Sequence, residues 1–312
     1  GDPTRGLKQM MEQVNLSRLS HAVRAAAMMR RCLNEALQAA SNRHAFGQRV
    51  MDYPLMQRQL LKIMVPTEAA LSVTLATADM MAKGYAGDKQ AAAALRLLTP
   101  LLKLRTCRDN ITVATGAMEV RGGNGYIEDF VNARLVRDAH IGVLWEGTSN
   151  INALDAIGRA VRKDRAHLAL QAVLREKLHG VQHSAPDMAR QLGHALDQAI
   201  ALAETVATRP EFENETRRAA SAVYYAAAAV LLAWEATQPG VDGRRLLLAD
   251  AVLRTHLLAA DPMTAPSTLT HPREAALLGS ARLSLQEARE FLAPAQRTAT
   301  APAAAAQPEL VG

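Results

Sequence analysis

Residues 7–43 read LKQMMEQVNLSRLSHAVRAAAMMRRCLNEALQAASNR. Apolar residues recur in this stretch at spacings of three and four: Met10, Met11, Val14, Leu19, Val23 and Ala27. This period is typical of one long amphipathic helix, and the pattern stops where Gly47 and Pro54 interrupt it. We therefore expect this stretch to form a helix that buries one face and exposes the other.

The same helical period continues through the rest of the chain. In the first half it predicts further helices at 55–82, 90–120, 128–140 and 149–163. In the second half it predicts helices at 168–178, 187–207, 213–237, 244–259 and 273–292. Alanine runs and few aromatic residues, 4% of the chain, also favour helix. We expect an all-α protein: an up-down four-helix bundle over 1–163, an additional helical domain over 164–292, and a disordered Ala/Pro tail over 293–312.

Charge and composition exclude several classes of protein. Residues 1–160 hold 20 basic and 14 acidic side chains, whereas residues 161–312 hold 16 of each, so the net charge of +6 belongs to the first half. That placement suits a bound anion better than a general nucleic-acid coat. The longest apolar run, 222–234, is shorter than the roughly 20 residues of a bilayer span. With no signal peptide at the start and only two distant cysteines, we expect a cytoplasmic protein without a membrane span.

Glu146 is the first candidate for chemistry. It lies between Trp145 and Gly147 in a loop that precedes a predicted helix, for which Thr148 or Ser149 can supply the cap. Apolar neighbours would raise the pKa of such a carboxyl group toward the range of a general base. The alternative is an exposed loop carboxylate or a first-turn helix acid, and spacing alone leaves both interpretations open.

Two further groups could bind an anion. Gly122, Gly123 and Gly125 allow backbone amides to approach a phosphate or a ring, although such a run is also a common helix C-cap. Arg43 can bind a pyrophosphate with Phe46 against a ring, or it can be a solvated helix-end arginine. His179 and His183 lie four residues apart without a third ligand, so no metal site is expected.

These motifs together resemble the C-terminal helical domain of acyl-CoA dehydrogenases. The resemblance covers about residues 6–162 and rests on the order of four motifs: Arg43-x-x-Phe46-Gly47, Gly-Gly-Asn-Gly-Tyr at 122–126, Arg137-Asp138 and Glu-Gly-Thr-Ser at 146–149. Met118-Glu119-Val120, Asn150-Ile151 and Leu154-Asp155 are similar to the AidB-type branch, which is linked to the adaptive response to DNA alkylation. That branch also carries an extra helical region after the core.

The resemblance implies a role for each matching residue. Glu146 becomes the base that removes the α-proton of an acyl thioester while the β-hydride passes to FAD, and Ser17 stands where another subgroup has its base. The predicted FAD-binding residues are Arg43, Phe46, Glu119, Gly122, Gly123, Thr148 and Asn150, with Glu119 standing where the family usually has glutamine. The predicted residues for the acyl-CoA substrate are Asn15, Arg18 and Gly147.

The function implied by the resemblance is that of an FAD-dependent acyl-CoA dehydrogenase of fatty acid metabolism. The family acts as a homo-oligomer and passes electrons to a partner. An alternative is an AidB-type flavoprotein that binds DNA with vestigial dehydrogenase activity, and a plain helical scaffold is a third. The family places a helical domain and a β-domain before this region, so the resemblance implies a fragment lacking them, which could be inactive alone.

Overall fold

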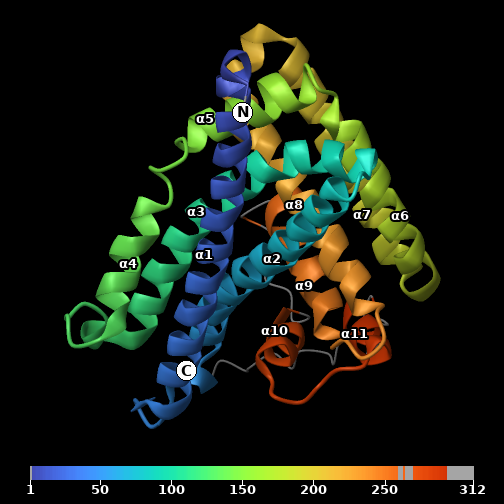
Figure 1. Cartoon of the computed structure of the whole chain (residues 1–312). Helices are drawn as coiled ribbons and strands as arrows, with labels where there is room; N and C mark the ends of the chain where they lie inside the picture. Colours follow the sequence, from blue (N-terminus) through green and yellow to red (C-terminus); the bar gives the residue numbers. More distant parts are fainter. Residues whose placement is uncertain (1, 259–262, 264–269, 294–312) are drawn as a thin grey trace, which may run out of the picture.

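The protein is almost entirely helical in the computed structural model, which describes residues 2–258, 263 and 270–293. Three long helices lie side by side in the first half, and shorter segments follow them (Figure 1). The elements of this half are η1 (Pro3–Arg5), α1 (Gly6–Asn42), β1 (His44–Ala45), β2 (Gln48–Arg49), η2 (Val50–Asp52), α2 (Pro54–Tyr85), α3 (Lys89–Arg121), η3 (Gly122–Gly125), α4 (Val131–Ile141), α5 (Ser149–Leu154) and η4 (Asp155–Val161). The predicted all-α class is confirmed.

Residues after 165 form a second group of helices that pack on the first (Figure 1). They are α6 (Ala166–Ser184), α7 (Pro186–Thr208), η5 (Pro210–Glu215), α8 (Thr216–Ala236), α9 (Arg244–Val252), η6 (Leu253–Leu257), α10 (Thr270–Leu278) and α11 (Leu285–Leu292). The predicted tail at 293–312 lies outside the described residues except for Ala293.

Local sequence explains where several helices begin. Pro54 takes the first position of α2, where its fixed φ suits the helix and its missing N–H costs nothing. The Asp88 side chain accepts a hydrogen bond from the Ala91 amide, 3.0 Å away, and so caps α3. Pro66 and Pro100 lie inside α2 and α3, which continue across them.

The structure corrects three local predictions. The break at 43–54 contains a two-residue β-hairpin, in which Phe46 and Gly47 both have positive φ, 51° and 91°. The helix predicted at 149–163 is short α-helix α5 followed by π-helical η4. The helix predicted at 273–292 is wrong, because Ser284 forms a capping box with Glu287 and starts α11 as a separate helix.

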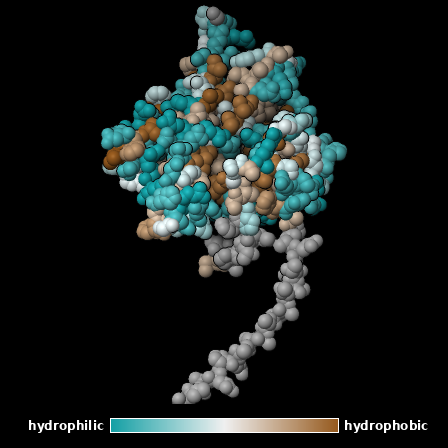
Figure 2. Space-filling model, turned by 90° about the horizontal axis from the view of Figure 1, so that it is seen from below, coloured by the Kyte–Doolittle hydropathy of each residue, from teal (hydrophilic) through white to brown (hydrophobic). Residues whose placement is uncertain are grey.

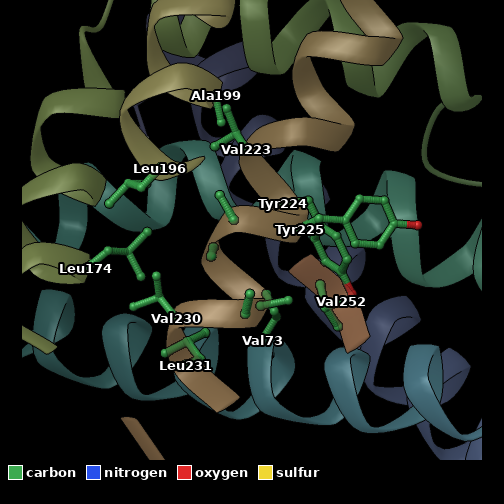
Figure 3. Packing of buried hydrophobic residues seen from close by; sticks show 14 of the residues in the cluster. Val73, Leu174, Leu196, Ala199, Val223, Tyr224, Tyr225, Val230, Leu231 and Val252 are labelled. Atoms are coloured by element: carbon green, nitrogen blue, oxygen red, sulfur yellow. The ribbon is translucent and has the colours of Figure 1, made fainter. Parts of the chain in front are cut away.

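The hydrophobic core extends across both halves of the chain. Figure 3 shows part of it around α8, with Tyr224 and Val230 facing side chains from several other helices. The surrounding residues are Val73 of α2, Leu174 of α6, Leu196 and Ala199 of α7, and Val252 of α9. Tyr224 is 0% exposed at this junction. The predicted division at residue 163 stays a prediction, since residues on both sides share one core.

Two helical stretches are long and apolar enough to cross a membrane: Pro54–Tyr85 and Pro210–Ala236. Both are mostly buried within the fold, with 61% and 78% of their most apolar windows inside it. Core helices of soluble proteins pass the same test of length and composition, so these stretches are explained by the shared core.

Candidate functional site

Glu146 lies in the loop between α4 and α5, in a backbone conformation that is unusual for its residue type. Its φ is 55°, and Gly147 follows with a φ of 92°. The neighbours Leu144 and Trp145 are 62% and 54% exposed, so they do not enclose Glu146 in the apolar pocket that the sequence suggested. The Trp145 ring instead meets the edge of His21 on α1, with centroids 5.8 Å apart. The strained loop holds the carboxylate at the surface between α1 and α5.

α1 fixes both ends of Glu146. The Ser17 hydroxyl donates a hydrogen bond to Glu146 Oε1 over 3.0 Å, and Arg18 Nε donates to the Glu146 carbonyl oxygen over 3.3 Å. Arg18 Nη1 also lies 3.3 Å from the Asn15 side-chain oxygen. The predicted residues Glu146, Asn15 and Arg18 are therefore brought together, although 128 residues separate Arg18 from Glu146 in sequence.

A buried ion-pair network supports Arg18. Arg18 is 4% exposed, and its Nη1 lies 2.6 Å from Asp155, whose other oxygen lies 2.8 Å from Arg96. Burial raises the pKa of Asp155, but hydrogen bonds and charges from Arg96 and Arg18 outweigh it and lower the pKa below 3.8. Arg18 therefore has an internal structural task, and its contact with coenzyme A stays a prediction.

Lys103 of α3 holds the Glu146 loop from inside. It is 1% exposed, and its Nζ donates to the carbonyl oxygens of Gly142 at 2.5 Å and Gly147 at 3.5 Å. Asn152 Nδ2 donates to the same Gly147 oxygen over 2.7 Å. Burial lowers the pKa of Lys103. The loop is thus tied at both sides of Glu146.

Replacing Lys103 with methionine is expected to loosen residues 142–147 while the helices persist. The variant keeps the aliphatic length but leaves the Gly142 carbonyl oxygen without its donor, at a cost of about 1–3 kcal/mol, and leaves the Gly147 oxygen with the donor from Asn152 alone. Amide hydrogen exchange in the loop should accelerate, whereas α2 should exchange as before. Lys62→Met on the same bundle serves as the control. Unchanged exchange in the loop would contradict the role of Lys103.

More positive charge gathers near Glu146 than the sequence indicated. Burial lowers the pKa of His21, the charges of Lys103 and Arg24 lower it further, and Glu146 acts in the opposite direction. Arg24 Nε and Nη2 are buried and have no hydrogen-bond partner among the described residues. An uncompensated guanidinium is costly, so this region favours an incoming negative charge.

The second set of predicted residues lies at the far end of α1. Arg43 is the C-cap of α1, and the hairpin that follows presents Phe46, which is 98% exposed. The Tyr53 hydroxyl donates to the carbonyl oxygens of Ala45 and Phe46, 2.8 and 3.0 Å away, and braces the hairpin. A fully exposed phenylalanine on a braced turn suits a contact with another molecule.

The glycine loop lies against Arg43. A Cβ placed on Gly122, whose φ is 73°, would be only 3.0 Å from Arg43 Nη1. Glu119, one turn earlier on α3, accepts a hydrogen bond from Gln59 Nε2 over 2.9 Å. The structure thus joins Arg43, Gly122 and Glu119 at one end of the bundle, and their contact with FAD stays a prediction.

Gly125→Ala is expected to destabilise the fold, whereas Gly123→Ala is expected to be nearly neutral. A Cβ at Gly125 would lie 2.4 Å from the Met118 carbonyl oxygen, but one at Gly123 would meet nothing within 4 Å. Relieving a backbone collision costs about 1–3 kcal/mol. Urea unfolding of the two variants measures the difference, and equal free energies of unfolding would contradict it.

The predicted cofactor residues therefore fall into two separate groups. Arg43, Phe46, Glu119, Gly122 and Gly123 lie at the hairpin end, while Thr148 and Asn150 start α5 beside Glu146 (Figure 1). The 25 residues of α1 from Arg18 to Arg43 rise about 37 Å at 1.5 Å each. Thr148 is the N-cap of α5, as predicted, but its side chain makes no capping hydrogen bond.

Sequence reasoning missed Lys103 and Asp155. Lys103 interrupts the run Leu101-Leu102-Lys103-Leu104, and a charged residue within an apolar run was an available signal of a buried, partnered side chain. Asp155 showed no comparable signal. Its two partners come from α1 and α3.

Comparison with known proteins covers the region that contains this site. The family model described as "Acyl-CoA dehydrogenase, C-terminal domain" matches residues 4–162, half of the chain. The chain belongs to the acyl-CoA dehydrogenase family. The match contains Glu146 with its contacts from α1 and α3, and it also contains the Arg43 and glycine-loop group.

Curated relatives of this acyl-CoA dehydrogenase family member are much longer than the matched region. "Acyl-CoA dehydrogenase family member 11" of Caenorhabditis elegans is 30% identical over 202 residues, covering 64% of this chain and 33% of that protein. "Putative acyl-CoA dehydrogenase AidB" of Escherichia coli is 32% identical over 152 residues, covering 49% of this chain and 28% of that protein. The chain matches about a third of their length.

Solved structures extend the fold similarity past residue 162. Caenorhabditis elegans ACDH-11 in complex with C11-CoA has a TM-score of 0.76 at 24% identity, covering 84% of this chain and 46% of that one. A Bacillus anthracis acyl-CoA dehydrogenase complexed with FAD has a TM-score of 0.63 at 16% identity, covering 93% of this chain and 58% of that one. The arrangement of the second helical group is therefore found in other members of this fold.

Proposed function

We propose that this chain is the C-terminal part of an FAD-dependent acyl-CoA dehydrogenase in which Glu146 removes the substrate α-proton. The observation that carries the proposal is the fixing of Glu146 and its loop by three contacts from two helices, α1 and α3. Ser17 holds its carboxylate, Arg18 holds its carbonyl oxygen, and Lys103 holds the next carbonyl oxygen along the loop. Family membership supports an oxidoreductase role for such a carboxylate.

The two carboxylate oxygens of Glu146 have different roles in the proposed removal of the proton. The Ser17 hydroxyl occupies Oε1 of Glu146, and Oε2 has no hydrogen-bond partner among the described residues. Oε2 can therefore accept the α-proton as the Cα–H bond of the acyl thioester breaks. The tied loop keeps the carboxylate in place during the transfer. When bound, FAD supplies the acceptor for the hydride that leaves the β-carbon.

The residues present fit FAD only if two copies of the chain share each cofactor. Arg43, Phe46, Gly122 and Gly123 would hold one portion, and Thr148 and Asn150 would hold another beside the base. About 37 Å of α1 separates these groups within one chain, which exceeds the reach of an extended FAD. Figure 2 views the molecule from the hairpin end, where hydrophobic side chains interrupt a hydrophilic surface. The proposal therefore includes a homo-oligomer. It also includes an electron-transfer partner, as the family resemblance implies, and a cytoplasmic location.

The AidB-type alternative, a flavoprotein that binds DNA, draws support from sequence similarity to AidB. Phosphate-driven binding requires excess positive charge, and residues 161–312 carry 16 basic and 16 acidic side chains. The charge distribution therefore favours the dehydrogenase. A shift of duplex DNA that falls steeply with salt would reverse this preference.

Flavin spectroscopy tests the proposed function. The purified chain should be examined alone and joined to the domains that precede this region in its relatives, with absorbance read across the flavin bands. The joined protein is expected to bind FAD, and a matching acyl-CoA from a chain-length series should bleach it. If the joined protein binds no flavin, or if no acyl-CoA bleaches it, the dehydrogenase proposal is rejected and a helical scaffold without a ligand becomes the better interpretation.

A further inference from the structure

A hollow of about 440 Å³ is lined mainly by residues that follow the family-matched region, where α6 begins beside the C-terminal half of α7. Arg162 and Arg165 reach it from the segment between η4 and α6, and Arg209 reaches it from the end of α7. Nothing in the proposed dehydrogenase reaction uses these residues. The hollow is therefore a separate feature of the second helical group.

The charge of the hollow is positive and largely unneutralised. Across the described part of the chain, none of Arg162, Arg165 and Arg209 has an ion-pair partner, and Arg209 contacts only the Phe212 ring, 5.7 Å from its centroid. Asp164, the acidic residue next to Arg165, is paired with Arg96 at 2.9 Å. Three cations around one hollow give it a positive potential, which favours an anion.

His167 partners the acidic residue that lines the hollow. It lines the hollow and is 1% exposed, and its Nε2 lies 2.8 Å from Glu204. Its Nδ1 is buried and has no hydrogen-bond partner within the described residues. Glu204, the acidic residue that lines the hollow, is thus already engaged by the imidazole. With Nε2–H donated to that carboxylate, Nδ1 of a neutral ring is an acceptor and offers an anion no hydrogen bond, so the arginines are the donors of the hollow.

The backbone at the start of α6 also favours an anion in the hollow. Arg165 adopts a left-handed conformation with φ 50°, and α6 starts directly after it with no side chain capping its N-terminus. The free amides and dipole at this end of a 19-residue helix favour negative charge. Guanidinium groups around such an end match the oxygens of a phosphate.

We infer that this hollow binds the phosphate group of a small molecule, held by Arg162, Arg165 and Arg209 at the start of α6 beside His167. The ligand is a free phosphate anion or a phosphate ester such as a nucleotide, because both present the same oxygens. The site is distinct from the one proposed for FAD and acyl-CoA, so its test does not depend on dehydrogenase activity.

Titration of the 312-residue chain with inorganic phosphate and with ADP tests the inference. Binding is measured by calorimetry and by the imidazole resonances of His167, with sodium chloride at equal ionic strength as the reference. Phosphate is expected to shift the His167 resonances saturably, and chloride is not. Tighter binding of ADP than of phosphate identifies an ester as the ligand, whereas equal binding identifies the free anion.

Matched arginine variants separate a site from diffuse charge. Arg165→Gln and Arg209→Gln should each weaken phosphate binding about tenfold, the size of one lost charged hydrogen bond. Arg289→Gln, which removes an exposed positive charge from α11, should leave the affinity unchanged. Circular dichroism verifies folding of each variant. The inference is overturned if phosphate leaves His167 unaffected, if Arg289→Gln weakens binding equally, or if only duplex DNA binds.

Discussion

Replacing Glu146 with glutamine is expected to slow flavin reduction by acyl-CoA about 10²–10⁴-fold, the usual contribution of a positioned general base. The amide keeps the size and the hydrogen bond from Ser17 but cannot accept the α-proton. The rate of flavin bleaching under single turnover measures this loss, in the joined protein described above. Substrate affinity should change little, because the contacts of the main chain with Arg18 and Lys103 persist.

Glu12→Gln is the matched control, since Glu12 is an exposed carboxylate on the same helix α1. It should leave the bleaching rate unchanged. Ser17→Ala should have a smaller effect than Glu146→Gln, because it frees Oε1 without removing the base. Bleaching at the wild-type rate in Glu146→Gln would show that Glu146 is not the base.

Replacing Asp155 with alanine is expected to cost about 3–5 kcal/mol of the free energy of unfolding. Asp155 is the shared anion of Arg18 and Arg96, and the side chains of Asp155 and Arg18 are only 7% and 5% exposed. Without Asp155, the guanidinium groups of Arg18 and Arg96 would lose the carboxylate that they share inside the fold. Urea unfolding of the chain measures the loss. Asp79→Ala, which breaks an exposed pair with Lys83, should cost less than about 1 kcal/mol.

The same ion pair implies a pH dependence of stability. Because the pKa of Asp155 is lowered in the fold, its contribution is fully present above the unfolded value of 3.8. It is lost as the pH falls through the lower folded pKa. The free energy of unfolding should therefore decline below about pH 4, and less so in Asp155→Ala. If the free energy of unfolding falls equally with pH in the wild-type protein and in Asp155→Ala, then Asp155 is not the source of the pH dependence.

The fold class and most helices could be predicted because their signals are local. The apolar period over residues 7–43 corresponds to α1, and α2, α3, α7 and α8 fall close to their predicted ranges. Errors arose where tertiary contacts or caps overrode the period. The capping box at Ser284 divides one predicted helix into α10 and α11, and η4 departs from regular α-helix after Leu154.

The candidate site was predicted in part. The family resemblance pointed to Glu146, Arg43 and the glycine loop, whose roles stay predictions, and the structure places Arg43 beside Gly122. The spacing of the motifs did not show that Glu146 contacts α1 at Ser17 and Arg18, far along the helix from Arg43. That separation follows from the rise of α1 and is the reason to propose a shared cofactor.

The sequence by itself determined the helical class and the motifs of the family resemblance, since each depends on residues close together in the chain, and it singled out the Glu146 carboxylate as a candidate base. Only the tertiary structure decided what holds that carboxylate. Arg18 and Asp155 are 137 residues apart, and Lys103 and Gly142 are 39 apart. No local period encodes such pairs, because they form only when α1, α3 and the loop after α4 pack together and exclude water from the charges between them.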